Sequence, residues 1–519
     1  MTWSLNQKQC YEAAKIRWEL VPYTRGRGLD VGCGLEKAFP HFIGVDNNQD
    51  EWLFGEGNRA VAADLIVPDA TVLDGLASGV YDFVFSSHML EHVEKYQDAL
   101  KEWWRLIKPG GFLILYLPHA DLYPRRGTEG ANPDHKWDFR EADIIQAMKD
   151  LGGWDLVRNE QRDEGEEYSF FQVYKKLESA DQLFSHADPK PVGKRCAIVR
   201  YGAWGDAVQM SSVLPGLKEQ GFHITFYTNP RCWEIMQSDP HIDAVYLQDT
   251  NQVPNPWLFD FWEHERKKYD RWINLSESVE GTWLALKGRP NHSWSYETRC
   301  KYLNANYVEF QHALAGVPYV KPLMKFHPKS EELVWVKEQR SIVWGPVMLW
   351  AISGSSIHKI WPHMDQIFAR FLLTYPQGRI ITVGGTLETH IEGPWRREPR
   401  VIRKSGKWSI RETLAFTQTC DIVVGPETGI LNAMAMEPMP KVVILSHSSP
   451  ENLTRDWINT QAVHSVKTAC WPCHRMHYTS EFCPRDEQLG VAQCQADLGP
   501  DMVWSAIQNA LRSQNRQAA

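Results

Sequence analysis

The sequence predicts an α/β protein with three Rossmann-like domains. Two segments, near residues 28 and 195, each begin with a short apolar strand, make a glycine-containing turn and enter a helix. That order opens a doubly wound α/β domain. A third unit begins at SIVWGPVMLWAISGSS and contains two more apolar strands, at 378–385 and 420–429. The 519 residues also suit three or four domains of about 150 residues each.

We expect one linker, which separates the first domain from the other two. The first covers residues 1–177. The stretch ESADQLFSHADPKPVGK at 178–194 contains two prolines and no clear periodicity, which is typical of a linker. The second and third domains then cover residues 195–340 and 341–519.

Composition excludes two classes of protein. The chain is 43% hydrophobic and 23% charged, with no apolar run long enough to cross a bilayer, which excludes an integral membrane protein and leaves peripheral membrane contact open. The 56 Lys and Arg against 64 Asp and Glu give a net charge of -8, so the chain lacks the basic balance of a nucleic-acid binder. The start, MTWSLNQKQC, lacks the basic and apolar regions of a secretory signal, and we therefore expect a cytoplasmic protein.

The first glycine turn, GLDVGCG at 28–34, follows a strand that ends at Asp30. Gly32 and Gly34 allow the backbone to turn and approach a ligand closely. A dinucleotide fingerprint requires a third glycine where Lys37 stands, which disfavours NAD and FAD. A second acid, Asp46, ends the next strand, where a carboxylate can accept hydrogen bonds from both ribose hydroxyls.

Linked motifs across residues 25–175 extend this pattern. They are LDVGCG, IGVD, AADL, YDFVFSSHMLEHVEKYQDALKEWWRLIKPGGFLILYLPH and NPDHKWDFR. In this order they resemble the class I S-adenosylmethionine-dependent methyltransferases, specifically a compact subgroup with little sequence between the glycine loop and the ribose-binding acid. The resemblance implies a site in which Asp30, Gly32 and Gly34 hold the methionine part of S-adenosylmethionine, Asp46 binds the ribose, Asp64 and Leu65 flank the adenine, and Ser87 and His88 face the acceptor.

Methyl transfer requires a positioned acceptor and a group that takes its proton. The candidate bases are His88, His92, His119 and His135. A structural role at a helix start is favoured for His92, whereas His88 and His135 stay open as catalytic bases. The chain has no Asn/Asp-Pro-Pro-Tyr/Phe or Pro-Cys motif, which argues against the usual nucleobase methyltransferases.

The second glycine turn lies in VRYGAWGDAVQMSSVLPGLKE, where Gly202 and Gly205 interrupt the strand and Asp206 stands at a helix start. Alone, Asp206 fits a helix N-cap better than a general base. The context reverses this order. Through this stretch and SDPHIDAVY, HKIWP, VGGTLE, CDIVVGPETGILNAMA and SHSSPENLT, residues 195 to about 505 resemble the ADP-heptose:lipopolysaccharide heptosyltransferases, which are two-domain GT-B glycosyltransferases.

This second resemblance implies an inverting glycosyl transfer with Asp206 as the catalytic base. The implied nucleotide-sugar site contains Gly202, Gly205, Lys359 on the diphosphate, Glu388 on the nucleoside, and Glu427, Thr428 and Gly429 near the phosphates. A strand, then PETG, then a helix also presents backbone N–H groups to an anion. The family usually has Asp at Glu427 and His at Asn432; these departures leave the sugar open, with an ADP-linked sugar as the family default.

Four cysteines near the end form a separate group: Cys470, Cys473, Cys483 and Cys494. Four soft ligands can close a tetrahedral zinc site, with His474 or His477 as substitutes. The alternatives are buried free thiols or a redox-labile pair.

Together these features predict a bifunctional enzyme that methylates and glycosylates a glycan or glycosylated acceptor. One alternative is a methyltransferase with a non-catalytic, glycan-binding glycosyltransferase-like module, and another is an enzyme of hypermodified nucleic acid. The sequence leaves the acceptor, the sugar, the order of reactions and the oligomeric state open.

Overall fold

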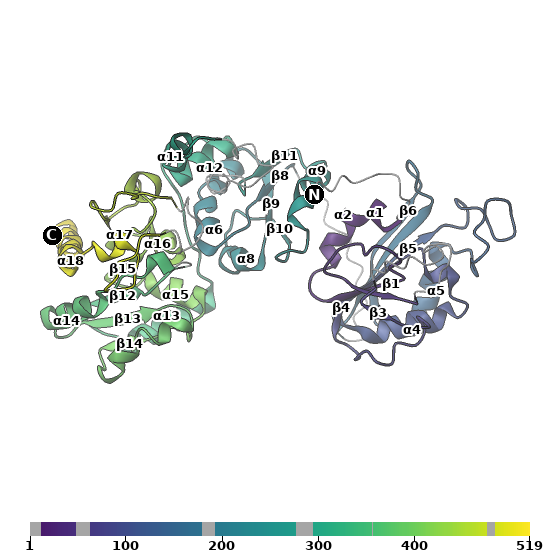
Figure 1. The fold of residues 1–519 in the computed structure, drawn as a ribbon, viewed down its shortest axis with the longest axis horizontal. Coiled ribbons are helices and arrows are strands. Elements are labelled where there is room, and N and C mark those ends of the chain that lie inside the picture. Colours follow the sequence, from purple (N-terminus) through teal and green to yellow (C-terminus); the bar gives the residue numbers. More distant parts are fainter. Residues whose placement is uncertain are drawn as a thin grey trace. The chain divides into compact units, whose positions relative to one another are not determined.

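A computed structural model describes residues 12–47, 63–178, 193–276, 294–354, 357–474 and 483–518. The chain divides into two compact units (Figure 1). Unit 1 contains Met1–Lys190 and Gln248–Lys268, and unit 2 contains Pro191–Leu247 and Tyr269–Ala519. The chain therefore passes between the units three times. No helix in the described part of the chain is both long enough and apolar enough to span a bilayer.

Unit 1 is built on a seven-stranded sheet of order β3-β2-β1-β4-β5-β7-β6. The strands are β1 (Gly28–Val31), β2 (Ile43–Asp46), β3 (Leu65–Ile66), β4 (Tyr81–Ser87), β5 (Ile107–Pro118), β6 (Trp154–Arg162) and β7 (Ser169–Lys176). Strands β1 to β5 pair in parallel, and β7 is antiparallel to both β5 and β6. Because the chain leaves β1 toward β2 on one side and β4 pairs on the other, the carboxyl ends of these strands form a ligand-binding crevice.

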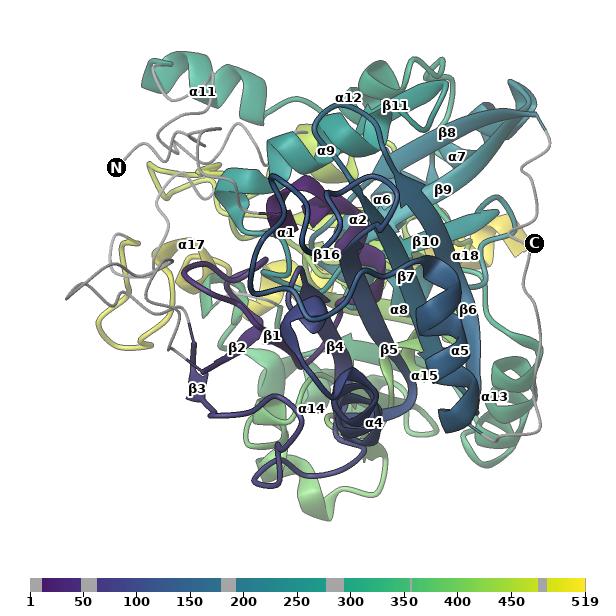
Figure 2. The same cartoon turned by 90° about the vertical axis from the view of Figure 1, so that its right-hand side faces the viewer.

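One face of this sheet is covered by two helices that lie side by side (Figures 1 and 2). They are α4 (Tyr96–Leu106) and α5 (Glu141–Leu151). Helix α4 buries Leu100 and Trp103 completely, at a spacing that places both on one helix face. The short helices of unit 1 are α1 (Glu12–Lys15), α2 (Arg17–Leu20), η1 (Val21–Tyr23), η2 (Leu90–His92) and η3 (Asn255–Trp257), followed by the longer α9 (Leu258–Arg266).

The opposite face is covered by aromatic side chains from distant parts of the chain. The β1–β2 connection, residues 32–42, contains no helix. In its place, Trp18 of α2 packs against Phe261 of α9 with ring centroids 6.0 Å apart, and Phe39 packs 6.0 Å from Trp257. Gln248–Lys268 is thus part of the unit 1 core, although it lies within the predicted domain 195–340, whose boundaries stay a prediction.

Unit 2 contains two parallel sheets, of order β10-β9-β8-β11 and β14-β13-β12-β15-β16-β17. The strands are β8 (Lys194–Val199), β9 (Phe222–Thr228), β10 (Ala244–Leu247), β11 (Arg271–Asn274), β12 (Val347–Ala351), β13 (Arg379–Val383), β14 (Val401–Arg403), β15 (Ile422–Pro426), β16 (Lys441–Ile444) and β17 (Thr460–Val463). With the sheet of unit 1 they confirm the predicted α/β class with three Rossmann-like sheets.

One hydrophobic core joins both sheets of unit 2. The helices are α6 (Trp204–Ser211), α7 (Leu214–Glu219), α8 (Pro230–Met236), α11 (Tyr296–Leu303), α12 (Tyr307–Ala315), α13 (Ser330–Ile342), α14 (Met364–Thr374), α15 (Ile410–Thr417), α16 (Gly429–Met434), α17 (Gln493–Ala496) and α18 (Pro500–Ala518). Single turns are η5 (Ile357–Lys359), η6 (Leu387–Thr389), η7 (Gly393–Arg397) and η8 (Pro450–Thr454). Helices α6 and α16 come from different sheets and pack against each other.

Candidate functional site

The glycine loop of unit 1 follows the carboxyl end of β1 and contacts the carboxyl end of β2. Gly32 has φ 80° and Gly34 has φ 57°, in the region that only glycine adopts readily. A Cβ on Gly32 would lie 2.3 Å from Cγ of Met89, so this position also requires glycine for space. The Gly34 N–H donates to Oδ2 of Asp46 at 2.9 Å. The loop is therefore fixed to the carboxylate at the end of β2.

Asp30 lies beneath the loop. It is 2% exposed and accepts a hydrogen bond from the Ala38 N–H at 2.8 Å. Burial raises the pKa of Asp30 to about 7, although the Ala38 amide opposes this rise. The side chain thus links the start of the loop to its end.

Asp64 pairs with Lys37, the residue that replaces the third glycine of a dinucleotide fingerprint. Its Oδ2 accepts from Lys37 Nζ and from the Gly44 N–H, both at 2.8 Å. The Lys37 hydrogen bond lowers the pKa of Asp64. Leu65 follows it in β3 and is half-buried.

Two features at these strand ends fit a bound S-adenosylmethionine. The Oγ of Ser87 is buried and has no hydrogen-bond partner among the described residues. Among the described residues other than its two chain neighbours, none has an atom within 4 Å of a Cβ built on Gly34. The open glycine surface therefore adjoins the acid of β2, and the unpartnered Ser87 hydroxyl lies at the carboxyl end of β4.

His88 follows Ser87 directly, with φ 48°. Its Nε2 lies 2.8 Å from Oγ of Ser169 and 3.7 Å from Oε2 of Glu12. Burial lowers the pKa of His88 to about 3. His88 is therefore a weak proton acceptor, better suited to hydrogen bonding than to holding a proton. Its role as a base stays a prediction.

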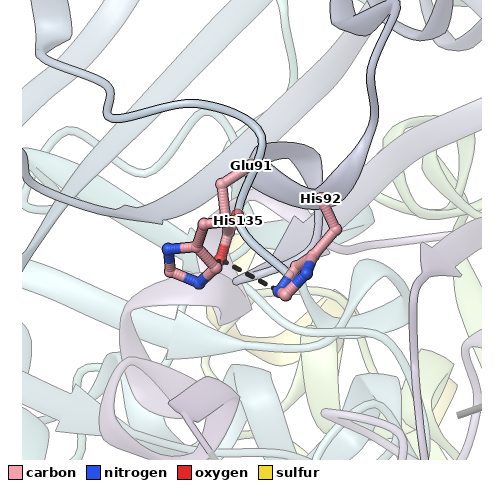
Figure 3. Close-up of side chains that lie close together, drawn as sticks. All are labelled: Glu91, His92 and His135. Atoms are coloured by element: carbon pink, nitrogen blue, oxygen red, sulfur yellow. Dashed lines mark ion pairs between the residues drawn. The ribbon is translucent and has the colours of Figure 1, made fainter. Parts of the chain in front are cut away.

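His135 and His92, for which the sequence analysis favours different roles, lie together. Their rings meet edge to face with centroids 4.8 Å apart. Between them lies Glu91, whose Oε1 is 3.9 Å from Nε2 of each histidine (Figure 3). Burial lowers the pKa of His135 to about 4 and also lowers that of His92. The fourth candidate, His119, instead pairs with Glu141 at 3.0 Å.

Sequence reasoning missed Glu91. It is 1% exposed, and burial raises its pKa to about 8, although its own backbone amide lowers it in part. The one local signal was an acid adjacent to a candidate histidine in MLEHV.

In unit 2, Asp206 lies in the first turn of α6. Its Oδ2 accepts from the Ala203 N–H at 2.7 Å, and its Oδ1 lies 3.3 Å from Nη2 of the buried Arg200. Ala203 is the N-cap, so Asp206 caps the helix from its third position while its side chain is 30% exposed. These contacts fix one orientation of an accessible carboxylate.

The first turns of α6 and α16 lie against each other. A Cβ on Gly429 would lie 3.1 Å from Cβ of Trp204 and 3.2 Å from N of Gly205, so both glycines allow this approach. A hydrogen bond also joins the two helices: Asn432 Oδ1 in α16 accepts from Gln209 Nε2 in α6 at 2.9 Å. The structure thus brings the predicted base and the PETG turn to one place.

The other residues predicted to bind the nucleotide sugar make hydrogen bonds within unit 2. Lys359 Nζ donates to the Glu427 carbonyl at 2.6 Å, and Ser353 donates to the Glu388 carboxylate. The Glu427 side chain accepts from the His447 N–H at 3.0 Å and from the Ser446 hydroxyl. Thr428 caps α16 through the Leu431 N–H at 3.4 Å, and Gly202 has φ 132°.

The four terminal cysteines line one narrow cavity. His358 and His447 line it as well, and none of the four cysteines forms a disulfide bond with another described residue. Burial raises the pKa of Cys494 to about 12 and also raises that of Cys483. The four predicted cysteine ligands therefore line the same cavity, whereas His477, a predicted substitute, lies outside the described residues.

Comparison with known proteins finds matches of two kinds, methyltransferases and glycosyltransferases. A family model described as a methyltransferase domain matches residues 29–115. A curated relative is the malonyl-[acyl-carrier protein] O-methyltransferase of Enterobacter lignolyticus (strain SCF1), 29% identical over 126 residues that make up 23% of this chain and 49% of the relative. The chain thus spans about half the length of that relative. The predicted resemblance of the N-terminal part of the chain to methyltransferases is confirmed, and the bounds 1–177 stay a prediction.

Two glycosyltransferase structures are also among the similar proteins. The E. coli ADP-heptose lipopolysaccharide heptosyltransferase II has a TM-score of 0.46 and 15% identity, covering 62% of this chain and 99% of its own. A glycosyl transferase family 9 protein of Veillonella parvula DSM 2008 has a TM-score of 0.47 and 15% identity, covering 62% and 97%. Both families that the sequence resembles are therefore found among the similar proteins.

Proposed function

We propose that this chain is a bifunctional transferase. Unit 1 transfers a methyl group from S-adenosylmethionine, and unit 2 transfers a glycosyl group from a nucleotide sugar with inversion, both to a glycan or glycosylated acceptor. The observation that carries the proposal is a pair of sites: Asp46 contacts the glycine loop, and the first turn of α6, which carries Asp206, packs against the first turn of α16. Two sites on one chain raise the effective concentration of a shared acceptor.

In unit 1, we assign the donor to the glycine loop and the ends of β2 and β4. Asp46 binds the ribose, the Gly32–Gly34 backbone approaches the methionine part, and Ser87 contributes its buried Oγ. When bound, S-adenosylmethionine supplies an electrophilic methyl group on a sulfonium. The chain's own contribution is to place the acceptor in line and take its proton.

In unit 2, we assign Asp206 as the base. An inverting transfer needs one carboxylate to take the acceptor proton, while the nucleotide leaves from the opposite side of the anomeric carbon. Arg200 and the Ala203 amide orient this carboxylate. We assign Lys359, Thr428 and Gly429 to the diphosphate, with ADP as the default nucleotide.

A second candidate keeps unit 2 as a non-catalytic glycan-binding module. It is favoured by the internal use of Glu427 and Asn432, which stand where the family usually has Asp and His. Asp206→Asn separates the two candidates. The catalytic proposal expects glycosyl transfer to fall by at least a hundredfold with nucleotide-sugar binding kept, whereas unchanged acceptor modification in this variant supports the module.

Thermal-shift titration tests the main proposal. S-adenosylmethionine and ADP-sugars should each raise the unfolding temperature, because ligands that bind only the folded form stabilise it. Asp46→Ala should lose the first shift and keep the second. Folded wild type that shifts with neither donor and turns over neither contradicts the proposal.

We also propose that Cys470, Cys473, Cys483 and Cys494 hold a structural zinc ion. The single cavity that they line supports this assignment. Chelation of the purified chain should remove the one zinc equivalent that these cysteines hold and lower the unfolding temperature of unit 2, measured by elemental analysis and calorimetry. A chain purified from zinc-supplemented cells that carries no metal at these cysteines contradicts it, with Cys196→Ser as the control for thiol loss.

A further inference from the structure

Glu91, His92 and His135 form a cluster of potential metal ligands beside the glycine loop. Each offers one ligand atom, and these atoms all lie within 4.8 Å of one another (Figure 3). A metal with bond lengths of about 2.0–2.2 Å to imidazole and carboxylate places such atoms about 3.0–3.4 Å apart. The 3.9 Å separations of Glu91 Oε1 from each Nε2 are therefore closed by small side-chain rotations.

The Glu91 carboxylate points to a cation. It is 1% exposed, and neither oxygen accepts a hydrogen bond from any other residue that the structure describes. Burying a carboxylate without partners costs several kcal/mol, at least about 3, and proteins normally pair such groups or bind a metal with them. The other two members of the cluster are imidazoles, which are also common metal ligands.

Backbone hydrogen bonds hold the cluster together. The N–H groups of Lys136 and Trp137 both donate to the Glu91 carbonyl, at 2.7 Å and 3.2 Å. The Trp137 indole donates to the Val93 carbonyl at 3.0 Å. The loop that carries His135 is thus fixed to the turn that carries Glu91, which organises the three ligands before any ion binds.

Two imidazoles and one carboxylate make an open-sided ligand set. Such sets bind divalent first-row transition metals and leave positions for substrate oxygens. Met89, directly before η2, packs against Gly32, so the cluster adjoins the loop assigned to the methyl donor. The open positions therefore lie near the acceptor side of the proposed methyl-transfer site.

We propose that Glu91, His92 and His135 bind a divalent transition-metal ion whose open positions take hydroxyl oxygens of the methyl acceptor. The metal lowers the pKa of a bound hydroxyl, as it does that of water, so that the proton passes to solvent and the oxygen becomes nucleophilic. The role of the metal in activating the acceptor rests on the proposed methyl transfer. It also supplies the activation that His88, as a weak proton acceptor, lacks.

Mn²⁺ binding to the chelator-treated full chain, followed by electron paramagnetic resonance, tests the site. Mn²⁺ is the probe because carboxylate and imidazole suit it better than the thiols of the cysteine cavity. We expect one Mn²⁺ site per chain, weakened more than about tenfold by Glu91→Gln and by His92→Ala, and a Mn²⁺-dependent rise in unfolding temperature that both variants lose. Circular dichroism confirms that the variants are folded.

His241→Gln is the matched control, since His241 belongs to the other cluster of potential ligands, with Asp239 and His327. It should bind Mn²⁺ as wild type does. Absence of binding at millimolar Mn²⁺, or wild-type affinity in folded Glu91→Gln, overturns the proposal. S-adenosylmethionine binding is measured separately by calorimetry: Mn²⁺ binding without donor binding supports the metal site and contradicts the proposed methyl transfer, whereas the reverse contradicts the site alone.

Discussion

Gly32 carries two separate constraints, a positive φ and contact with Met89. The pattern DVGCG predicts the first, because a strand-to-loop turn at this position requires glycine. The second depends on a residue 57 positions later, and no local pattern shows it. The same holds for Glu91: its position beside His135 depends on a loop pinned 44 residues away, so the sequence predicts the histidine as a candidate and misses the acid.

Gly32→Ala should weaken S-adenosylmethionine binding by more than tenfold, measured by calorimetry. The added methyl must displace Met89 or strain the loop, at a cost of about 1–3 kcal/mol. Gly79→Ala is the control, because Gly79 has φ 67° but no atom within 4 Å of a Cβ there. Equal loss of binding in both variants would show that backbone strain, not the loop's shape, is responsible.

Glu427 makes unit 2 sensitive to acid. Burial alone would raise its pKa, but His447, Lys359 and Ser446 lower the pKa to about 2. A carboxylate with a folded-state pKa below its usual value of about 4.5 stabilises the fold above pH 4.5, and this is lost as the pH falls toward 2. Glu427→Gln should therefore lower the unfolding temperature at pH 7 and have a smaller effect near pH 3.

The control for this prediction is Glu331→Gln, which removes an exposed carboxylate of α13. It should change the unfolding temperature little at either pH. A Glu427→Gln effect that is the same at pH 7 and pH 3 would contradict the assignment of this stability to the ionised carboxylate.

At the scale of elements, the sequence predicts several of the parallel strands but not their order in the sheets. The buried strands are short runs of apolar residues, which is a local signal. Helix α9 differs, because its role is set by partners far away in the sequence. Its aromatic residues could equally serve a core of unit 2, and only the packing of Phe261 on Trp18 shows that they cover the helix-free β1–β2 side of unit 1.

Phe261→Ala should destabilise unit 1 by about 3–5 kcal/mol, since it removes a fully buried aromatic ring. Phe259→Ala is a matched control on the same helix, because Phe259 is 68% exposed. Hydrogen exchange of β1 and β4 peptides measures the effect. Faster exchange in Phe261→Ala alone supports α9 as part of unit 1, and equal exchange in both variants contradicts it.

At the scale of the whole molecule, the three chain crossings tie the two units together. The segment Gln248–Lys268 lies within the second predicted domain but belongs to the compact unit of the N-terminal part of the chain, so the two units are not a simple tandem arrangement. Sequence similarity predicts the two families, since their motifs are local and ordered. It does not predict this insertion, because the exchange of a segment between domains changes packing without changing any motif.

Calorimetric titration of both donors into one preparation tests the central claim of two independent donor sites most directly. The account predicts one S-adenosylmethionine and one ADP-sugar per chain, with Asp46→Ala abolishing only the first and Lys359→Ala weakening only the second by at least tenfold. Binding of a single donor by the folded wild type, or loss of both donors in either variant, would contradict it.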